Sequence, residues 1–157
     1  MALQTGQSAP DFTLYSDNRQ KVTLSELHGT NVLLLFFPAA FTSVCTAELC
    51  ATRDNLAFYN NANAKVFGIS VDSVYTLAKF KEEQHLNFPL LSDFNKTVSI
   101  AYGALYDTFA FEMHGVSKRA AFVIDEAGII QYAEVLENAG EQPNFEKIQA
   151  CLGVLQR

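Results

Sequence analysis

Apolar and polar residues along the chain alternate between the two-residue period of a strand and the 3.6-residue period of a helix. Continuous apolar runs predict central strands covered on both faces, and shorter alternating runs around turn residues predict hairpins. Strands are predicted as a pair within residues 11–24, around a turn at 16–18, and then at 32–37, 65–71, 88–93, 119–125 and 129–135.

Helical periodicity predicts four helices between these strands. The first runs from Thr42, a candidate N-cap, to about Tyr59. Its apolar stripe consists of Cys45, Leu49, Leu56 and Tyr59. The others are a helix capped by Asp72 or Ser73, a short helix at 95–102 stopped by Gly103, and a last helix that Pro143 opens and that buries Phe145, Ile148, Leu152 and Leu155.

Strands that alternate with helices, followed by a hairpin and a closing helix, predict an α/β fold with helices around one sheet. The 157 residues contain no repeats or linkers, so we expect a single domain over residues 1–157. The formal net charge of −6 argues against a nucleic-acid partner. No apolar run approaches the ~20 residues of a membrane span, so no membrane partner is expected. Residues 1–12 lack a secretory-signal pattern, which makes the cytoplasm the expected compartment.

Two of the three cysteines lie in the segment PAAFTSVCTAELC, residues 38–50, directly behind the apolar run at 32–37. In a helix that starts near Thr42, Cys45 falls in the first turn, where unpaired N–H groups and the helix dipole favour a thiolate. Ligands and catalytic groups of open α/β sheets gather at the carboxyl ends of strands. Cys45 is therefore a candidate nucleophile, and the alternative is an inert buried thiol.

A fast thiol enzyme must also stabilise charge on the group that it expels. The Thr42 hydroxyl and a nearby cation are the candidates for this task. Spacing along the chain does not identify the cation.

The order Pro-x-x-x-Thr-x-x-Cys behind an apolar strand, with Pro38, Thr42 and Cys45 in place, resembles the signature of the peroxiredoxin family. The resemblance extends over the chain through GxxAPDFTL at 6–14, FGISVDS at 67–73 and SKRAAFVID at 117–125. Within the family the chain looks most like the AhpE group (alkyl hydroperoxide reductase E), through FFPxAFTxxCxxEL.

This resemblance implies a thioredoxin-like fold, a central mixed β-sheet flanked by helices, with an N-terminal β-hairpin extension. It also implies reduction of hydrogen peroxide or organic hydroperoxides without a cofactor. By the same resemblance, Cys45 attacks the peroxide and becomes a sulfenic acid, while Pro38 shields the pocket from water. Thr42 hydrogen-bonds the thiolate and the peroxide, Arg119 polarises both, and Glu48 matches the acidic position that orients the arginine.

Cys50 separates two ways of resolving the sulfenic acid. A Cys-x4-Cys pair is typical of the peroxiredoxin Q group (bacterioferritin comigratory protein), whose second cysteine resolves, whereas AhpE-like members usually work with one. Five residues along an ideal helix place two Cα atoms about 8.7 Å apart. A disulfide tolerates at most about 7 Å, so a Cys45–Cys50 bond requires the first helical turns to unwind. The alternative is resolution by an external thioredoxin-, glutaredoxin- or mycoredoxin-like thiol.

Cys151 lies next to the apolar stripe of the last helix, which favours a packing role over resolution from a second subunit. A homodimer is expected from the AhpE resemblance alone. A zinc site is not expected, because Cys45 and Cys50 have no cysteine or histidine neighbours at ligand spacing.

Arg53 is expected either to pair with Glu48 or to be a solvated surface residue. For the aromatic residues Tyr106, Phe109 and Phe111 we expect mostly core packing, with the pocket mouth or a dimer contact as alternatives.

Two other functions would use the same fold. A thioredoxin-like disulfide reductase is disfavoured, because no Cys-x-x-Cys is present. A non-enzymatic redox sensor or holdase would oxidise once and stop, whereas a peroxidase turns over.

Overall fold

The computed structural model describes residues 3–155 of the chain. The strands are β1 (Thr13–Ser16), β2 (Lys21–Thr23), β3 (Asn31–Phe36), β4 (Ala64–Ser70), β5 (Leu90–Ser92), β6 (Leu105–Phe109), β7 (Met113–Ser117), β8 (Arg119–Ile124) and β9 (Ile130–Leu136). The helices are α1 (Ser43–Asp54), α2 (Leu56–Asn61), α3 (Val74–Gln84), α4 (Thr97–Ala101) and α5 (Phe145–Leu155), with 3₁₀ turns η1 (Leu24–Leu27) and η2 (Ala110–Glu112).

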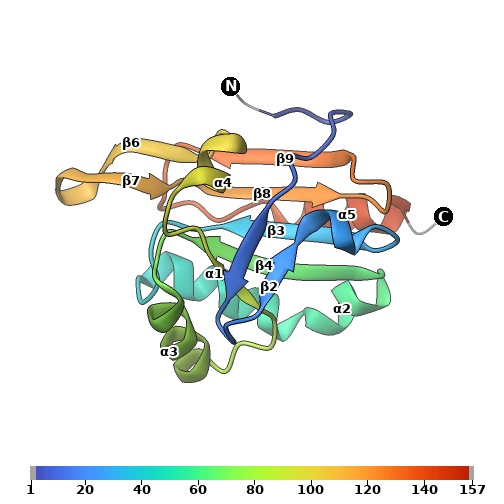
Figure 1. The fold of residues 1–157 in the computed structure, drawn as a ribbon. Coiled ribbons are helices and arrows are strands. Elements are labelled where there is room, and N and C mark those ends of the chain that lie inside the picture. The colour runs from blue at the N-terminus through green and yellow to red at the C-terminus, as the bar shows by residue number, and fades with distance from the viewer. Residues whose placement is uncertain (1–2, 156–157) are drawn as a thin grey trace.

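Seven strands form one sheet in the order β2-β1-β5-β4-β3-β8-β9, and β6 pairs with β7 apart from it (Figure 1). Strands β3, β4 and β5 are parallel, while β1 and β8 are antiparallel to their neighbours in the sheet. The predicted α/β class, the mixed sheet and the N-terminal hairpin of β1 and β2 are confirmed.

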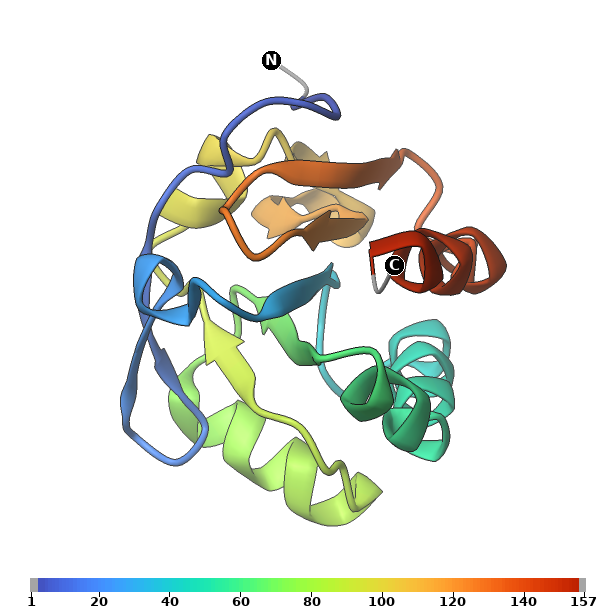
Figure 2. The ribbon, with the colours of Figure 1, turned by 90° about the vertical axis from the view of Figure 1, so that its right-hand side faces the viewer.

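The central strand β3 is buried along its whole length, as its continuous apolar run predicted. Alternate residues point to opposite faces of a strand. Leu33, Leu35 and Phe37 join a cluster with residues of α1, α2, α3 and α5. The intervening residues join a second cluster, with α4 and the N-terminal segment. Figure 2 shows α5 and the α1–α2 pair on one side of the sheet and α4 on the other.

The pairing of β8 with β3 determines where Arg119 lies. The two strands are antiparallel with Ala120 opposite Phe36, so Arg119, the first residue of β8, lies beside the carboxyl end of β3. Arg119 also shares the strand face of Ala121 and Val123, which belong to the cluster under α1. The fold therefore aims this side chain at the helix that follows β3.

The predicted helix from Thr42 to about Tyr59 is two helices, α1 and α2, separated at Asn55. The Asn55 side chain donates a 2.9 Å hydrogen bond to the carbonyl of Ala51, and its backbone N–H is shared between the Ala51 and Thr52 carbonyls. Asparagine competes in this way for backbone groups and so ends helices. The apolar stripe continues across the break, because Tyr59 is buried in the same cluster as Leu49.

The hairpin of β6 and β7 was not predicted from the sequence. Its connection, η2, places Phe111 and Glu112 at a positive φ of 60° without a glycine, so it carries no turn signal. The prediction that the nearby aromatic residues mostly pack in the core was wrong, because the Phe111 side chain is 95% exposed. Tyr106 and Phe109 are half-buried and pack on each other, with ring centroids 5.0 Å apart.

Ser73, and not Asp72, caps α3, because its hydroxyl accepts the backbone N–H of Thr76 at 3.2 Å. The Asp72 carboxylate is thereby left for a different contact. In the part of the chain that the structure describes, every helix is too short or too polar to cross a bilayer.

Gly68 in β4 provides a test of the central packing. A Cβ at this position would meet Leu90 Cδ2 at 2.7 Å and Phe37 Cε1 at 3.3 Å, and both neighbours are fully buried. We expect Gly68→Ala to lower the free energy of unfolding by about 1–3 kcal/mol in urea denaturation, since overpacking forces side chains off their rotamers.

The matched control is Gly153→Ala, because a Cβ there has no heavy atom within 4 Å and the residue lies in α5. This variant should raise the free energy of unfolding by about 1 kcal/mol. Equal effects of the two variants would contradict the close packing around β4.

Candidate active site

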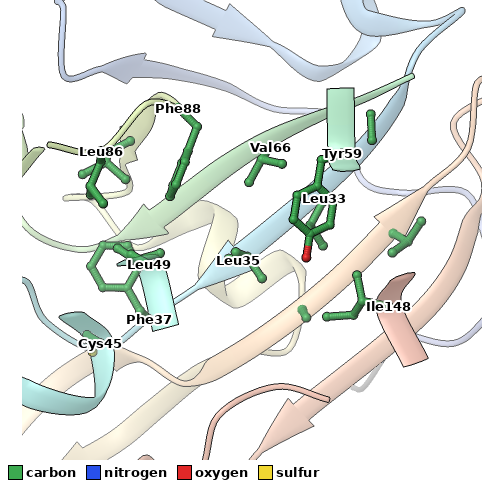
Figure 3. Packing of buried hydrophobic residues seen from close by; sticks show 14 of the residues in the cluster. Leu33, Leu35, Phe37, Cys45, Leu49, Tyr59, Val66, Leu86, Phe88 and Ile148 are labelled. Carbon is green, nitrogen blue, oxygen red and sulfur yellow. The ribbon is translucent and has the colours of Figure 1, made fainter. Parts of the chain in front are cut away.

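The start of α1 places Cys45 at the carboxyl end of β3. Thr42 is the N-cap, with extended backbone angles, and the first helical hydrogen bond runs from the N–H of Thr46 to the carbonyl of Thr42. Cys45 is the third residue of the helix, among the leading N–H groups that lack an intrahelical acceptor. Its side chain is 1% exposed, at one end of the buried cluster beside Phe37 and Leu49 (Figure 3).

The Thr42 side chain does not cap the helix, contrary to the prediction. Its hydroxyl instead donates a 2.8 Å hydrogen bond to the carbonyl of Ala39, within the same loop. Thr42 is exposed and lines the cavity in front of Cys45. Thr42 therefore borders the cavity, while its hydroxyl is bound within the loop that precedes the helix.

Arg119 supplies the cation that spacing could not identify. Its side chain is 1% exposed, and its Nη2 donates to Cys45 Sγ at 3.2 Å. Nη1 donates to Glu48 Oε1 at 3.0 Å, while Nε and Nη2 donate to the carbonyl of Ala139 at 3.2 and 2.9 Å. Planar donors held by three partners leave the guanidinium one orientation.

Glu48 is a buried carboxylate with an incomplete set of hydrogen bonds. It is fully buried, and its Oε2 has no hydrogen-bond partner. Burial raises the pKa of Glu48 to about 7 against the attraction of Arg119, and the charge of Glu134 adds to the increase. Burial alone would lower the pKa of Arg119, but the charges of Glu48 and Cys45 outweigh it and raise this pKa, so the guanidinium stays charged.

A cavity of about 240 Å³ opens in front of these groups. It is lined by Pro38, Ala39, Thr42, Ser43, Val44, Cys45, Phe109, Arg119, Ala139 and Gly140. One water molecule takes up about 30 Å³ in the liquid, so the cavity has room for more than hydrogen peroxide. A larger hollow of about 440 Å³ between Tyr15, Tyr75 and Phe94 is lined by no cysteine and shares no lining residue with this cavity.

The structure brings together the five residues predicted for the site, Pro38, Thr42, Cys45, Glu48 and Arg119. One contributor was missed. The Ala139 carbonyl belongs to a loop after β9, and a backbone group leaves no mark in a sequence. Phe109 lines the cavity, as the pocket-mouth alternative for the aromatic residues had it, and the unpredicted β6–β7 hairpin places it there.

The sequence left the roles of Arg53 and Cys50 open, and the structure shows where both residues lie. Arg53 does not pair with Glu48: it contacts Asp54 at 2.9 Å and donates to the carbonyl of Gln84 at 2.6 Å. Cys50 is half-buried in the same continuous helix as Cys45, with its sulfur 3.7 Å from Gln84 Oε1.

Cys151 is half-buried and packs against the cluster under α1, as its place beside the apolar stripe predicted. Among residues 3–155, no group of three or more histidine, cysteine, aspartate or glutamate side chains is placed to hold a metal ion.

Comparisons of the sequence and of the structure with known proteins give consistent matches. The profile of the AhpC/TSA family matches residues 5–133. Alkyl hydroperoxide reductase E of Mycobacterium tuberculosis is 43% identical over 136 residues, 85% of this chain and 86% of that protein. A putative peroxiredoxin bcp of Coxiella burnetii is 40% identical over 132 residues, 83% of this chain and 87% of that protein. The crystal structure of peroxidoxin BcpB from Mycobacterium tuberculosis superimposes with a TM-score of 0.86 at 32% identity, covering 98% of both chains.

The raised pKa of Glu48 predicts a pH-dependent stability. The usual value is 4.5 and the folded value about 7, so the unfolded chain releases this proton first as the pH rises. The folded protein therefore binds this proton more tightly than the unfolded chain does. The resulting contribution to the free energy of unfolding is fully present below pH 4.5 and is lost as the pH rises through 7. Replacing Glu48 with glutamine removes this loss.

We therefore expect the free energy of unfolding of Glu48→Gln, minus that of the wild type, to increase by up to about 3 kcal/mol between pH 4.5 and 8. Urea denaturation at a series of pH values measures this difference, in which other titrating groups cancel. A difference that stays constant with pH would contradict a titrating Glu48.

Proposed function

Because the chain belongs to the AhpC/TSA family of peroxiredoxins and is a thiol peroxidase, we propose that Cys45 is the residue that attacks the hydroperoxide. The observation that carries this proposal is the 3.2 Å contact between Cys45 Sγ and the buried guanidinium of Arg119, at the wall of a cavity. Cys50 and Cys151 do not line that cavity.

In the proposed reaction, the Cys45 thiolate gives its electron pair to one peroxide oxygen. A sulfur–oxygen bond forms as the oxygen–oxygen bond breaks, and the departing oxygen takes up a proton to leave as water or an alcohol. Cys45 is oxidised to a sulfenic acid, the first step of cysteine oxidation. Negative charge moves from sulfur to the departing oxygen, and Arg119 is already placed to stabilise it.

Pro38 and Thr42 have complementary roles in this proposal. Pro38 is buried and lines the cavity, where its ring excludes water from the sulfur. To donate to a bound peroxide, the Thr42 hydroxyl exchanges its hydrogen bond to the carbonyl of Ala39 for one to the peroxide, and both residues line the cavity. Glu48 holds Arg119 in place and does not touch the reacting atoms.

Both hydrogen peroxide and organic hydroperoxides are proposed as substrates. The cavity of about 240 Å³ exceeds the needs of hydrogen peroxide, and Val44 and Phe109 give it apolar walls. Such walls favour the organic group of a larger hydroperoxide.

For resolution of the sulfenic acid we propose Cys50 or, as the alternative, an external thioredoxin-, glutaredoxin- or mycoredoxin-like thiol. Cys50 lies in the intact helix α1, five residues after Cys45, so about 8.7 Å separates their Cα atoms. The hydrogen bond from Arg53 to the Gln84 carbonyl ties α1 to the end of α3. A direct disulfide therefore requires α1 to unwind from its N-terminal end.

A homodimer that associates through the active-site edge is also part of the proposal. Tyr75 and Phe94 support it, because they expose 73% and 61% of their surfaces, line one hollow and follow the carboxyl ends of β4 and β5. Large apolar side chains exposed together are typical of association surfaces.

Replacing Cys45 with serine should reduce thiol-dependent peroxide consumption to less than a few per cent of the wild-type rate, because serine cannot form the thiolate nucleophile. Peroxide loss in the presence of dithiothreitol is the measurement. Cys151→Ser is the matched control and should keep the wild-type rate, since Cys151 packs away from the cavity. Retained activity in Cys45→Ser would end the assignment of this residue.

Mass spectrometry after one equivalent of peroxide should separate the two resolving mechanisms. An intramolecular disulfide between Cys45 and Cys50 is the expected product if α1 unwinds readily, and Cys50→Ser should then stop at the sulfenic acid. A lasting sulfenic acid in the wild type, with Cys50 still free, would rule out the two-cysteine route and leave the external thiol.

A further inference from the structure

The loop between β3 and α1 carries three of the residues that line the cavity, Pro38, Ala39 and Thr42. Reaction at Cys45 depends on where this loop holds them. In the proposed reaction the peroxide must lie in line with the sulfur, about 3–3.5 Å away, and a displacement of 1 Å can cost about a hundredfold in rate. The loop must therefore be held by contacts from outside it.

The loop is strained at Phe41, and its internal hydrogen bond, from the Thr42 hydroxyl to the Ala39 carbonyl, does not involve that residue. Phe41 has a φ of 67°, in the left-handed region that a bulky side chain rarely adopts. This conformation costs about 1–2 kcal/mol for a residue with a Cβ. The Phe41 ring is 49% exposed and contacts the Phe80 ring at a centroid distance of 5.1 Å. A half-exposed ring offsets only part of that cost.

Asp72, at the end of β4, supplies a hydrogen bond directly before the strained residue. Its Oδ2 accepts the backbone N–H of Ala40 at 2.8 Å. The carboxylate is itself fixed, because the Ser70 hydroxyl donates to the same oxygen at 2.7 Å. The Ser92 hydroxyl donates to the Asp72 carbonyl at 2.6 Å, so the ends of β4 and β5 both hold Asp72. Both serines are buried, whereas Asp72 and Ala40 are half-buried, so the anchor is held from its buried side.

We infer that Asp72 is a positioning residue for peroxide reduction, which keeps the loop 38–42 in the strained conformation that presents Thr42 to the cavity. The inference rests on the proposed function of Cys45. Without the hydrogen bond from Ala40, Phe41 relaxes to a negative φ and the Ala39–Thr42 turn moves. Asp72 acts through the loop and does not touch the sulfur, so its loss should disturb alignment of the peroxide more than reactivity of the thiol.

The test compares two rates in Asp72→Ala and Asp72→Asn. The rate constant for oxidation of Cys45 by hydrogen peroxide is measured by competition with a haem peroxidase, since the chain has no tryptophan to follow. Alkylation of Cys45 by iodoacetamide is followed by peptide mass spectrometry. Its rate measures the reactivity of the Cys45 thiol and does not depend on the alignment of a peroxide. We expect Asp72→Ala to slow oxidation about 10- to 100-fold and alkylation less than threefold. Asp72→Asn keeps an acceptor oxygen and should stay within about threefold of the wild type in both.

Two further variants guard against a trivial loss of folding. Asp93→Asn is the matched control: Asp93 also follows a strand, but its carboxylate accepts the N–H groups of Val98 and Ser99 at the start of α4, so only stability should change. Ser70→Ala removes the hydroxyl that fixes Asp72 and should slow oxidation selectively but less, which tests the inference even if Asp72→Ala does not fold.

The outcomes separate the inference from the function on which it rests. A wild-type protein whose Cys45 does not react with peroxide would overturn the proposed function. A reactive wild type with an equally fast Asp72→Ala, or with oxidation and alkylation slowed by the same factor, would overturn the positioning role of Asp72 alone.

Discussion

A guanidinium buried between a helix and a sheet must be matched by anions and carbonyl oxygens, because an unpaired charge in the interior costs several kcal/mol. Arg119 meets this requirement with Glu48, the Ala139 carbonyl and the sulfur of Cys45. The sulfur of Cys45 is therefore one of the partners of the buried cation, and in the proposed function the same contact stabilises the reacting sulfur. Glu48 and Cys45 lie one helical turn apart in α1, so one helix presents both groups to the arginine.

The sheet holds the strand that leads into this contact. Every residue of β3 is buried, and the side chains on its two faces belong to two separate clusters, so the strand is fixed from both sides. Antiparallel pairing brings the first residue of β8 to the carboxyl end of β3, and the alternation of the strand turns Arg119 toward α1. Parallel β4 ends at the same edge and contributes Asp72 to the loop.

The site retains features that a purely structural region would avoid. Glu48 leaves Oε2 without a hydrogen bond, and its pKa is raised to about 7 by burial. Phe41 holds a left-handed conformation although it is a large aromatic residue. Strain and incomplete hydrogen bonding of this kind persist where the surrounding structure over-determines the geometry, and they are concentrated at functional sites. Here both lie within one turn of the thiol, while the clusters on the two faces of the sheet supply the stability that offsets them.

Apolar periodicity determined the strands, the start of α1 behind a buried strand, and hence the placement of Pro38, Thr42 and Cys45 around one edge, because these depend on residues adjacent in the chain. Periodicity did not predict the break at Asn55, because the break depends on a side chain that competes for backbone groups. It did not predict the β6–β7 hairpin either, because the connection adopts positive φ angles without a glycine. The family resemblance identified Arg119 as a candidate. Only the register of β8 on β3 places its side chain against Cys45, which lies 74 residues earlier in the chain. The Ala139 carbonyl and the Asp72 anchor were likewise decided by tertiary structure, because a backbone acceptor, or a carboxylate equally suited to capping a helix, acquires its partner only when distant segments are packed together.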